Sequence, residues 1–168
     1  MRIEPLCRIE MHYTSSSWHQ PFPRGDAPGE EAIGFGQGDG EVTGDIAGSL
    51  VWANYPRRRE DGVWTPNLRG VITTTEGEQI LVSIHGQSVA ERAPERRRAV
   101  TTRVELISEV ETYRWLNTSF IVGEGEIDED REDWWLATYV CINEEAVGPP
   151  AIGFDPPPRF RQLGSAAS

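Results

Sequence analysis

The chain has 168 residues, 38% of them hydrophobic, which is enough for one domain with its own core. Its formal net charge of −11 at pH 7 argues against nucleic acid as a partner, because neutralising phosphates requires a basic face. All 16 basic residues are Arg, and the lack of Lys excludes Schiff-base catalysis and a P-loop. The Arg runs at 57–59 and 96–98 are expected to form mainly solvated turns.

The start of the chain and its cysteines indicate a cytoplasmic protein. Residues 1–10 lack the apolar segment of a secretory signal, and no apolar run is long enough to span a membrane. Cys7 and Cys141 have no metal-ligand spacing and are expected to be free buried thiols. The 3 His residues show no fixed spacing either, so we expect no metal site.

Alternation of apolar and polar residues predicts the first strands. Residues 6–13 alternate, and one face is formed by Cys7, Ile9, Met11 and Tyr13. Residues 15–31 are rich in Ser, Pro, Gly and charge, which favours a long loop. Glycines crowd residues 33–48 and suggest bulges or tight bends, as at barrel corners, before a strand at 49–55.

The second half of the chain continues the β pattern. The turn signal Asp61-Gly62 precedes the clearest hairpin, which is closed at Glu76-Gly77. We expect the hairpin strands at 68–74 and 79–86, a charged loop at 89–98, a strand at 99–107, a short helical turn at 113–117, and two last strands at 120–127 and 134–142.

These elements predict an all-β fold. Seven to nine strands without a convincing amphipathic helix need closure into a barrel or sandwich to bury a core. We expect a closed antiparallel β-barrel of about eight strands over residues 1–143, with the long N-terminal loop, followed by an extended or disordered Pro-rich tail over residues 144–168.

The register of the hairpin suggests which side chains point inward. A two-residue loop at Glu76-Gly77 would pair Arg69 with Ile84 and direct Arg69 and His85 to opposite faces. The more apolar face carries Val71, Ile80, Val82 and Ile84, so Arg69 is expected to point into the barrel and His85 outward. A three-residue loop would change this parity.

Several short motifs together resemble the bacterial and fungal domain-of-unknown-function family 3237. They are GEVTGDIAGSL, the Asp61-Gly62 turn, RGVITTTEGEQILVSIHG, and TYRWLN followed by VGEG. The resemblance covers roughly residues 3–143. It implies a closed barrel of calycin-like or allene-oxide-cyclase-like shape. The segment WANYPRRRE and the loop at 15–31 depart from the family pattern, so ligand identity is expected to be particular to this chain.

The resemblance and the residue chemistry together nominate catalytic candidates. Arg69 matches the family's strand Arg and could anchor a carboxylate or phenolate, or form an ion pair with Glu105, Glu124 or Asp45. Asp45, Tyr139 and His85 could handle a proton, whereas a turn residue, a satisfied buried phenol and an outward His are the alternatives.

Further candidates would shape the pocket. Trp52 could stack against a ligand and Asn54 could hydrogen-bond to it. Trp115 and Asn117 belong to the YxWLN motif, which could instead plug a barrel corner and cap a turn. Glu124 stands where the family more often has an apolar residue, so an acid there could be specific to this protein.

The leading hypothesis is a small barrel enzyme that works without a cofactor on an aromatic or polyketide-like acid. The resemblance implies proton-transfer chemistry: decarboxylation, isomerisation or cyclisation. A non-catalytic small-ligand binder and an oligomerisation module are the alternatives. We expect a small-molecule partner, no nucleic acid and no membrane, and leave open a homo-oligomer.

Overall fold

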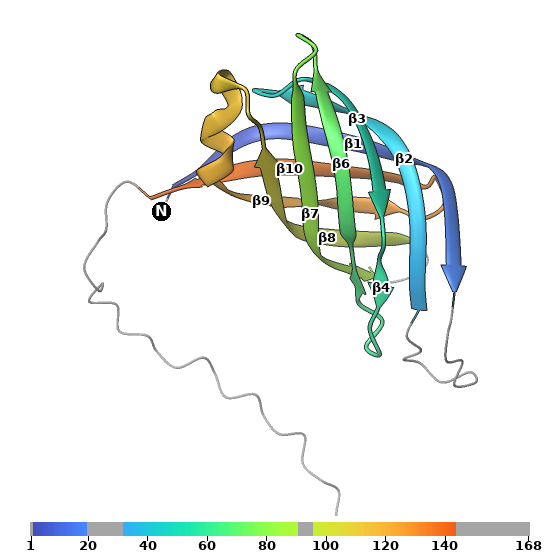
Figure 1. Cartoon of the computed structure of the whole chain (residues 1–168). Coiled ribbons are helices and arrows are strands. Elements are labelled where there is room, and N and C mark those ends of the chain that lie inside the picture. The colour runs from blue at the N-terminus through green and yellow to red at the C-terminus, as the bar shows by residue number, and fades with distance from the viewer. Residues whose placement is uncertain (1, 20–31, 91–95, 144–168) are drawn as a thin grey trace, which may run out of the picture.

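The computed structural model describes residues 2–19, 32–90 and 96–143. They form a continuous sheet that curls into a barrel (Figure 1). The elements are β1 (Arg2–His19), β2 (Ala32–Gly44), β3 (Gly48–Asn54), β4 (Arg57–Arg58), β5 (Trp64–Thr65), β6 (Asn67–Thr74), β7 (Gln79–Ala90), β8 (Arg97–Ile107), the 3-10 helix η1 (Glu111–Thr118), β9 (Phe120–Asp128) and β10 (Asp133–Ile142).

Eight strands close the barrel, in agreement with the expected fold class. The antiparallel order β1-β2-β3-β6-β7-β8-β9-β10 returns from β10 to β1. The last two expected strands and the short helical turn are confirmed as β9, β10 and η1. The predicted tail over residues 144–168 lies outside the described residues.

The first strand is longer than expected, so the predicted loop at 15–31 is wrong for its first part. β1 continues to His19, and Ser17 and His19 pair with Phe35 and Ile33 of β2. The register shifts once between Tyr13 and Ser15, which marks a β-bulge in β1. Backbone hydrogen bonding to a neighbouring strand outweighs the loop-like composition of these residues. Residues 20–31 lie outside the described residues.

Helix η1 closes one end of the barrel. Leu116 is its buried residue and packs into the core, while Trp115 is exposed. The Asn117 side chain accepts a hydrogen bond from the Ser108 backbone N–H at 2.8 Å and donates to its carbonyl at 2.9 Å. Asn117 therefore stabilises the turn at Ser108, and Leu116 is the residue of the YxWLN motif that fills this end of the barrel. Among the described residues, no helix has the length and apolar character needed to cross a membrane.

The middle of the barrel is filled by aliphatic side chains. The fully buried residues there come from every wall and include Ile9, Leu50, Ile72, Ile80, Ile84, Leu106, Ile121 and Leu136. Such dense packing leaves no room for a ligand at mid-height. Cys7 belongs to this core and Cys141 is partly buried; both are free thiols.

The predicted register of the β6–β7 hairpin is wrong by one residue. Thr74 N–H donates to the Glu78 carbonyl at 2.8 Å, which leaves a three-residue loop with Gly77 at φ 87°. This loop type places its glycine in the left-handed region. Thr73 consequently pairs with Gln79 and Arg69 with Ser83. Arg69 and His85 therefore both lie on the outer face, and the inward placement of Arg69 was wrong.

A small hairpin of β4 and β5 stands at the end of the barrel opposite η1 (Figure 1). Its turn contains Asp61 and Gly62, as expected, with Gly62 at φ 79°. β4 pairs with the start of β2, and Trp64 of β5 pairs with Ser88 of β7. The hairpin thus bridges two walls of the barrel at its open end.

Candidate functional site

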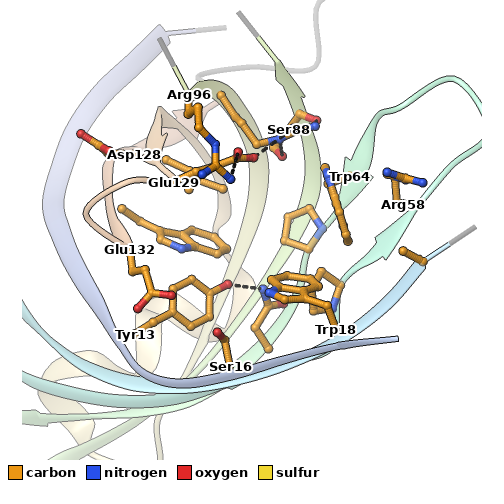
Figure 2. Close-up of a pocket in the computed structure, with 17 residues that line it drawn as sticks. Tyr13, Ser16, Trp18, Arg58, Trp64, Ser88, Arg96, Asp128, Glu129 and Glu132 are labelled. Atoms are coloured by element: carbon orange, nitrogen blue, oxygen red, sulfur yellow. Dashed lines mark hydrogen bonds and ion pairs between the residues drawn. The ribbon is translucent and has the colours of Figure 1, made fainter. Parts of the chain in front are cut away.

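A pocket of about 840 Å³ occupies the open end of the barrel (Figure 2). We call this end the mouth. Its lining comes from the mouth ends of β1, β2, β3, β7, β8, β9 and β10, from the β4–β5 hairpin and from the β9–β10 turn. Antiparallel strands bring alternating C-terminal and N-terminal ends to the same rim, so residues distant in sequence meet there.

Aromatic rings form the base of the pocket. Tyr13 and Trp134 line it, and Trp52 packs against both, with ring centroids 4.7 Å from Tyr13 and 6.0 Å from Trp134. A Cβ at Gly36 would lie 2.3 Å from Tyr13, and one at Gly38 would lie 2.6 Å from Trp52. The glycines of β2 therefore make room for these rings; β2 itself shows no bend from a bulge, since the bulge lies in β1.

Asn54 fixes the orientation of the Tyr13 hydroxyl. Its Nδ2 donates to the Tyr13 hydroxyl at 3.1 Å, which is the dashed line at Tyr13 in Figure 2. Its Oδ1 accepts the Asn67 backbone N–H at 2.9 Å. Because the Asn67 donor settles which side of the amide is oxygen, the Tyr13 oxygen must act as acceptor here. No acceptor among the described residues takes the Tyr13 hydroxyl proton.

The indole N–H of Trp134 is a second hydrogen-bond donor at the base of the pocket. Trp134 is 3% exposed, and its Nε1 is buried without a hydrogen-bond partner among the described residues. Buried N–H groups normally have partners, so an unpaired one that lines a pocket points to a ligand. We call Tyr13, Asn54 and Trp134 the floor of the pocket.

Burial keeps the Tyr13 phenol protonated. Desolvation raises the pKa of Tyr13 to about 12, against the opposing effects of the Asn54 hydrogen bond and of the neighbouring Trp134 N–H, and with a smaller contribution from the negative charge of Glu132. At neutral pH Tyr13 is therefore a hydrogen-bond donor or a weak acid, not a base.

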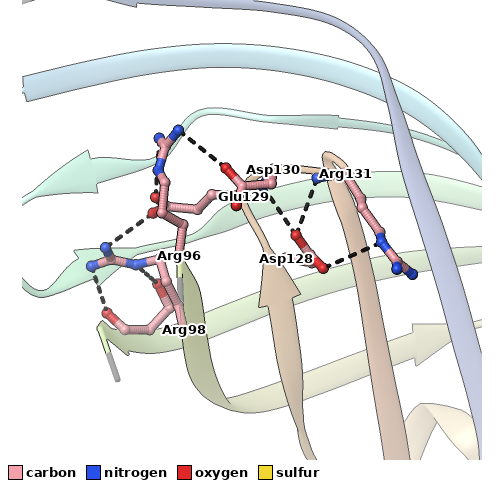
Figure 3. A network of polar contacts seen from close by, with 7 residues as sticks. Arg96, Arg98, Asp128, Glu129, Asp130 and Arg131 are labelled. Carbon is pink, nitrogen blue, oxygen red and sulfur yellow. Dashed lines mark hydrogen bonds and ion pairs between the residues drawn. The ribbon is translucent and has the colours of Figure 1, made fainter. Parts of the chain in front are cut away.

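Arg98 lies at the wall of the pocket and corrects the expectation of a solvated turn at 96–98. Its side chain is 11% exposed. Its guanidinium donates to Glu129 Oε1 at 3.2 Å (Figure 3). It also donates to Ser88 Oγ at 3.1 Å and to the Gly62 carbonyl at 2.9 Å. Arg98 thereby connects β7, the β4–β5 hairpin and the β9–β10 turn.

Most acids of the rim are already engaged. Glu129 pairs with both Arg96 and Arg98, at 3.4 and 3.2 Å (Figure 3). Asp128 Oδ1 accepts the backbone N–H groups of Asp130 and Arg131. These carboxylates therefore already have partners within the protein.

Glu132 is the exception at the rim. Its φ is 58°, in the left-handed region that non-glycine residues rarely adopt. Its carbonyl accepts the Tyr13 backbone N–H at 3.0 Å, which joins the β9–β10 turn to β1. No ion pair or hydrogen bond within the described residues occupies its carboxylate, which lines the pocket near Tyr13 (Figure 2).

Two further Trp residues stand at the entrance. Trp18 of β1 and Trp64 of β5 pack edge to face with ring centroids 4.9 Å apart. The guanidinium carbons of Arg58 and Arg98 lie 6.0 and 5.9 Å from the Trp64 ring centroid. The entrance thus combines apolar faces with cationic groups.

The site residues expected from sequence divide between the pocket and the outside. Asn54 lines the pocket and Trp52 supports its floor. Arg69 Nη1 lies 2.5 Å from His85 Nε2 on the outer face. Partial burial, and then the Arg69 charge, lower the pKa of His85. This pair is therefore a feature of the outer surface.

The other expected residues also lie away from the mouth. The Tyr139 hydroxyl donates to Glu124 Oε1 at 3.1 Å on the outer face, and this bond raises the pKa of Tyr139. Asp45 lies in the exposed β2–β3 turn, and Trp115 and Asn117 lie on η1, at the closed end. No cluster of three or more potential metal ligands occurs in the segments that the structure describes.

Three pocket residues were not among the site residues predicted from sequence: Tyr13, Trp134 and Arg98. Each continues the inward alternation of its strand: Tyr13 follows Ile9 and Met11, and Arg98 precedes Val100. A polar or aromatic residue at the end of an apolar strand face could have indicated the pocket. Barrel interiors are apolar at mid-height and become more polar at the rim.

No family model and no curated protein sequence matches this chain. Solved structures do match. A β-barrel-like protein from Acinetobacter baumannii has a TM-score of 0.67 and 16% identity, over 83% of this chain and 94% of that one. A protein of unknown function from Clostridium acetobutylicum has a TM-score of 0.70 and 16% identity, over 84% of this chain and 100% of that one.

An enzyme from Penicillium herquei also shares the fold. Its TM-score is 0.62 and its identity 18%, over 83% of this chain and 92% of that one. At such identities the likeness concerns the fold alone. The chain is a small β-barrel whose neighbours in structure include an enzyme and proteins without an assigned function.

Proposed function

We propose that the mouth pocket binds an oxygenated aromatic or polyketide-like acid and that the chain promotes a proton transfer on it: a decarboxylation, an isomerisation or a cyclisation. The observation that carries this proposal is the floor, where a partly buried phenol O–H and a buried indole N–H have no acceptor among the described residues at the base of an aromatic cavity. Hydrogen-bond donors in a water-poor pocket stabilise negative charge that develops on a substrate.

The size and lining of the pocket suit such a ligand. A volume of about 840 Å³ is within the usual range of small-molecule sites. Rings on Tyr13, Trp134, Trp18 and Trp64 offer flat apolar surfaces for a planar ligand. Arg58 and Arg96 stand at the rim, where an acid group would remain close to solvent, and Arg96 is already paired with Glu129 and Asp130.

The proton-transfer part rests on two groups. Tyr13 is held protonated and could donate a proton or a hydrogen bond to the substrate. The Glu132 carboxylate has no partner among the described residues, and its backbone adopts a left-handed conformation of the kind that occurs at functional sites. We assign Glu132 the role of proton acceptor and Tyr13 that of donor.

The likeness to other proteins supports the same proposal at a general level. The motifs of the chain resemble domain-of-unknown-function family 3237, and its fold is shared with an enzyme from Penicillium herquei. The segment WANYPRRRE, which departs from the family pattern, contributes Asn54, Pro56 and Arg58 to the pocket. We propose that this segment adapts the site to its own ligand.

A non-catalytic binder is the second candidate. Glu129 and Asp128 are engaged by Arg side chains and backbone amides, which leaves Glu132 as the one rim acid of the described residues suited to act as a base. A pocket with so few free acids could hold a ligand without changing it.

Incubation with a panel of aromatic carboxylic acids would separate the two functions. Mass spectrometry would detect loss of carbon dioxide or isomers of unchanged mass, and calorimetry would detect binding. We expect turnover in the native chain, its loss in Glu132→Gln, and full retention in Glu124→Gln, whose acid lies on the outer face. Binding without turnover would favour the binder, and the absence of both would reject the pocket.

A further inference from the structure

We infer that Tyr13 and Trp134 together form a site for a single carbonyl or anionic oxygen of the ligand. This inference rests on the proposed function and specifies its substrate class: a ketone, enolate or phenolate whose oxygen is inserted at the floor. Carboxylate recognition at the rim would be a separate contact.

The hydrogen-bonding capacity of the floor supports a ligand acceptor. Asn54 uses its Nδ2 on the Tyr13 oxygen and its Oδ1 on the Asn67 N–H. What remains is the Tyr13 O–H, which has no acceptor among the described residues, and the buried Trp134 Nε1–H, which makes no hydrogen bond there and acts on Tyr13 only as a neighbouring donor. An oxygen that accepts from both would satisfy the floor, since a carbonyl or phenolate oxygen has two or more lone pairs.

The same inventory disfavours a donor group at this position. An ammonium or amide N–H would meet two donors and one oxygen that already accepts from Asn54. The Glu132 carboxylate, which could accept, is exposed at the rim. Because buried groups must find partners of the opposite kind, the ligand should enter with its oxygen first.

The aromatic surroundings strengthen this selectivity. Trp52 and Trp134 have ring centroids 6.0 Å apart, and both contact Tyr13, so little water can reach the inserted oxygen. Hydrogen bonds to a charged oxygen are stronger where water is excluded. The floor therefore favours the anionic form of a ligand over the neutral form.

Para-nitrophenol is a suitable probe because its phenolate absorbs visible light. Nitrobenzene is the matched control, because it keeps the ring and the nitro group and lacks only the phenolic oxygen. We expect the native chain to bind the phenolate more tightly than nitrobenzene and to lower the apparent pKa of the bound phenol. In Tyr13→Phe, phenolate affinity should fall by roughly 10-fold, as for one hydrogen bond to a charged group, with nitrobenzene affinity unchanged. Tyr139→Phe, which removes an outer hydroxyl, should bind both probes normally.

Trp134→Phe provides a second variant that keeps an aromatic ring but removes the N–H, with circular dichroism to verify folding. The native chain alone also tests the idea through the ratio of the two affinities. The oxygen site would be overturned if phenolate and nitrobenzene bound equally well, or if Tyr13→Phe left the phenolate affinity unchanged. Either result would leave the pocket itself as a binding site. Failure of both probes to bind would overturn the proposed function and the inference together.

Discussion

The Asn54 amide donates to the Tyr13 hydroxyl at 3.1 Å and accepts the Asn67 backbone N–H at 2.9 Å. One side chain, 1% exposed, therefore joins β3 to the first residue of β6 and sets the direction of the phenol at the floor. The structural support of the barrel wall and the geometry of the pocket depend on the same amide.

Replacing Asn54 by Ala should destabilise the fold. The Asn67 N–H and the Tyr13 hydroxyl would both lose their hydrogen bond to a buried amide, at a cost of about 1–3 kcal/mol in the free energy of unfolding. Urea denaturation would measure this cost. Asn143→Ala, at an exposed position, is the matched control and should change stability by less than about 0.5 kcal/mol. Equal effects of the two substitutions would contradict the assigned role.

The chain should lose stability at alkaline pH through Tyr13. Its pKa in the folded chain is about 12, above the ordinary value of 10, so the folded state retains the proton longer than the unfolded state. The stabilisation is complete below pH 10 and is lost as pH rises towards 12, by about 2–3 kcal/mol in total.

Urea unfolding at a series of alkaline pH values would test this dependence. Tyr13→Phe should flatten the decline. Tyr139→Phe should leave most of it in place, because Tyr139 is solvated on the outer face. A decline that is identical in the native chain and Tyr13→Phe would rule out Tyr13 as its source.

Arg69→Ala should raise the pKa of His85 and leave ligand binding at the mouth intact. The Arg69 charge disfavours a protonated His85, but partial burial is the larger cause of the lowered pKa, so the rise should be partial. An NMR titration of the imidazole would follow the pKa, and probe affinity should stay within about two-fold of native. A large loss of affinity for the probe in Arg69→Ala would show that Arg69 does contribute to the ligand site.

Arg98→Ala should loosen the β4–β5 hairpin. The guanidinium holds the Gly62 carbonyl, Ser88 and Glu129, so its removal should cost about 1–3 kcal/mol and accelerate hydrogen exchange in the hairpin. Arg97→Ala is the matched control, since Arg97 is 42% exposed and pairs with Glu126 outside the pocket. Equal exchange in the two variants would show that Arg98 does not hold the hairpin.

Strand alternation made the β fold and many of the buried faces predictable. The inward set Cys7, Ile9, Met11 and Tyr13 follows directly from period-two patterning, and Trp52 with Asn54 was expected on one face. The loop at 15–19 was not predictable in this way, because its pairing with β2 depends on a partner strand and not on its own composition.

The inward residue of the β6–β7 hairpin depended on a single loop residue. A two-residue loop and a three-residue loop both fit the Glu76-Gly77 signal, yet they shift the pairing by one and exchange the faces. The observed loop moved Arg69 outside. A charge on an exposed face retains its hydration, which an apolar barrel wall would have removed.

The sequence by itself determined the β class, most of the strand segments and the apolar filling of the interior, because local alternation carries that information. Only the tertiary structure decided which residues share the mouth. Closure of the antiparallel barrel gathers the C-terminal ends of β1 and β3 with the N-terminal ends of β8 and β10, and so brings together Tyr13, Asn54, Arg98 and Trp134. Such contacts depend on strand order and register, which are properties of the closed sheet as a whole.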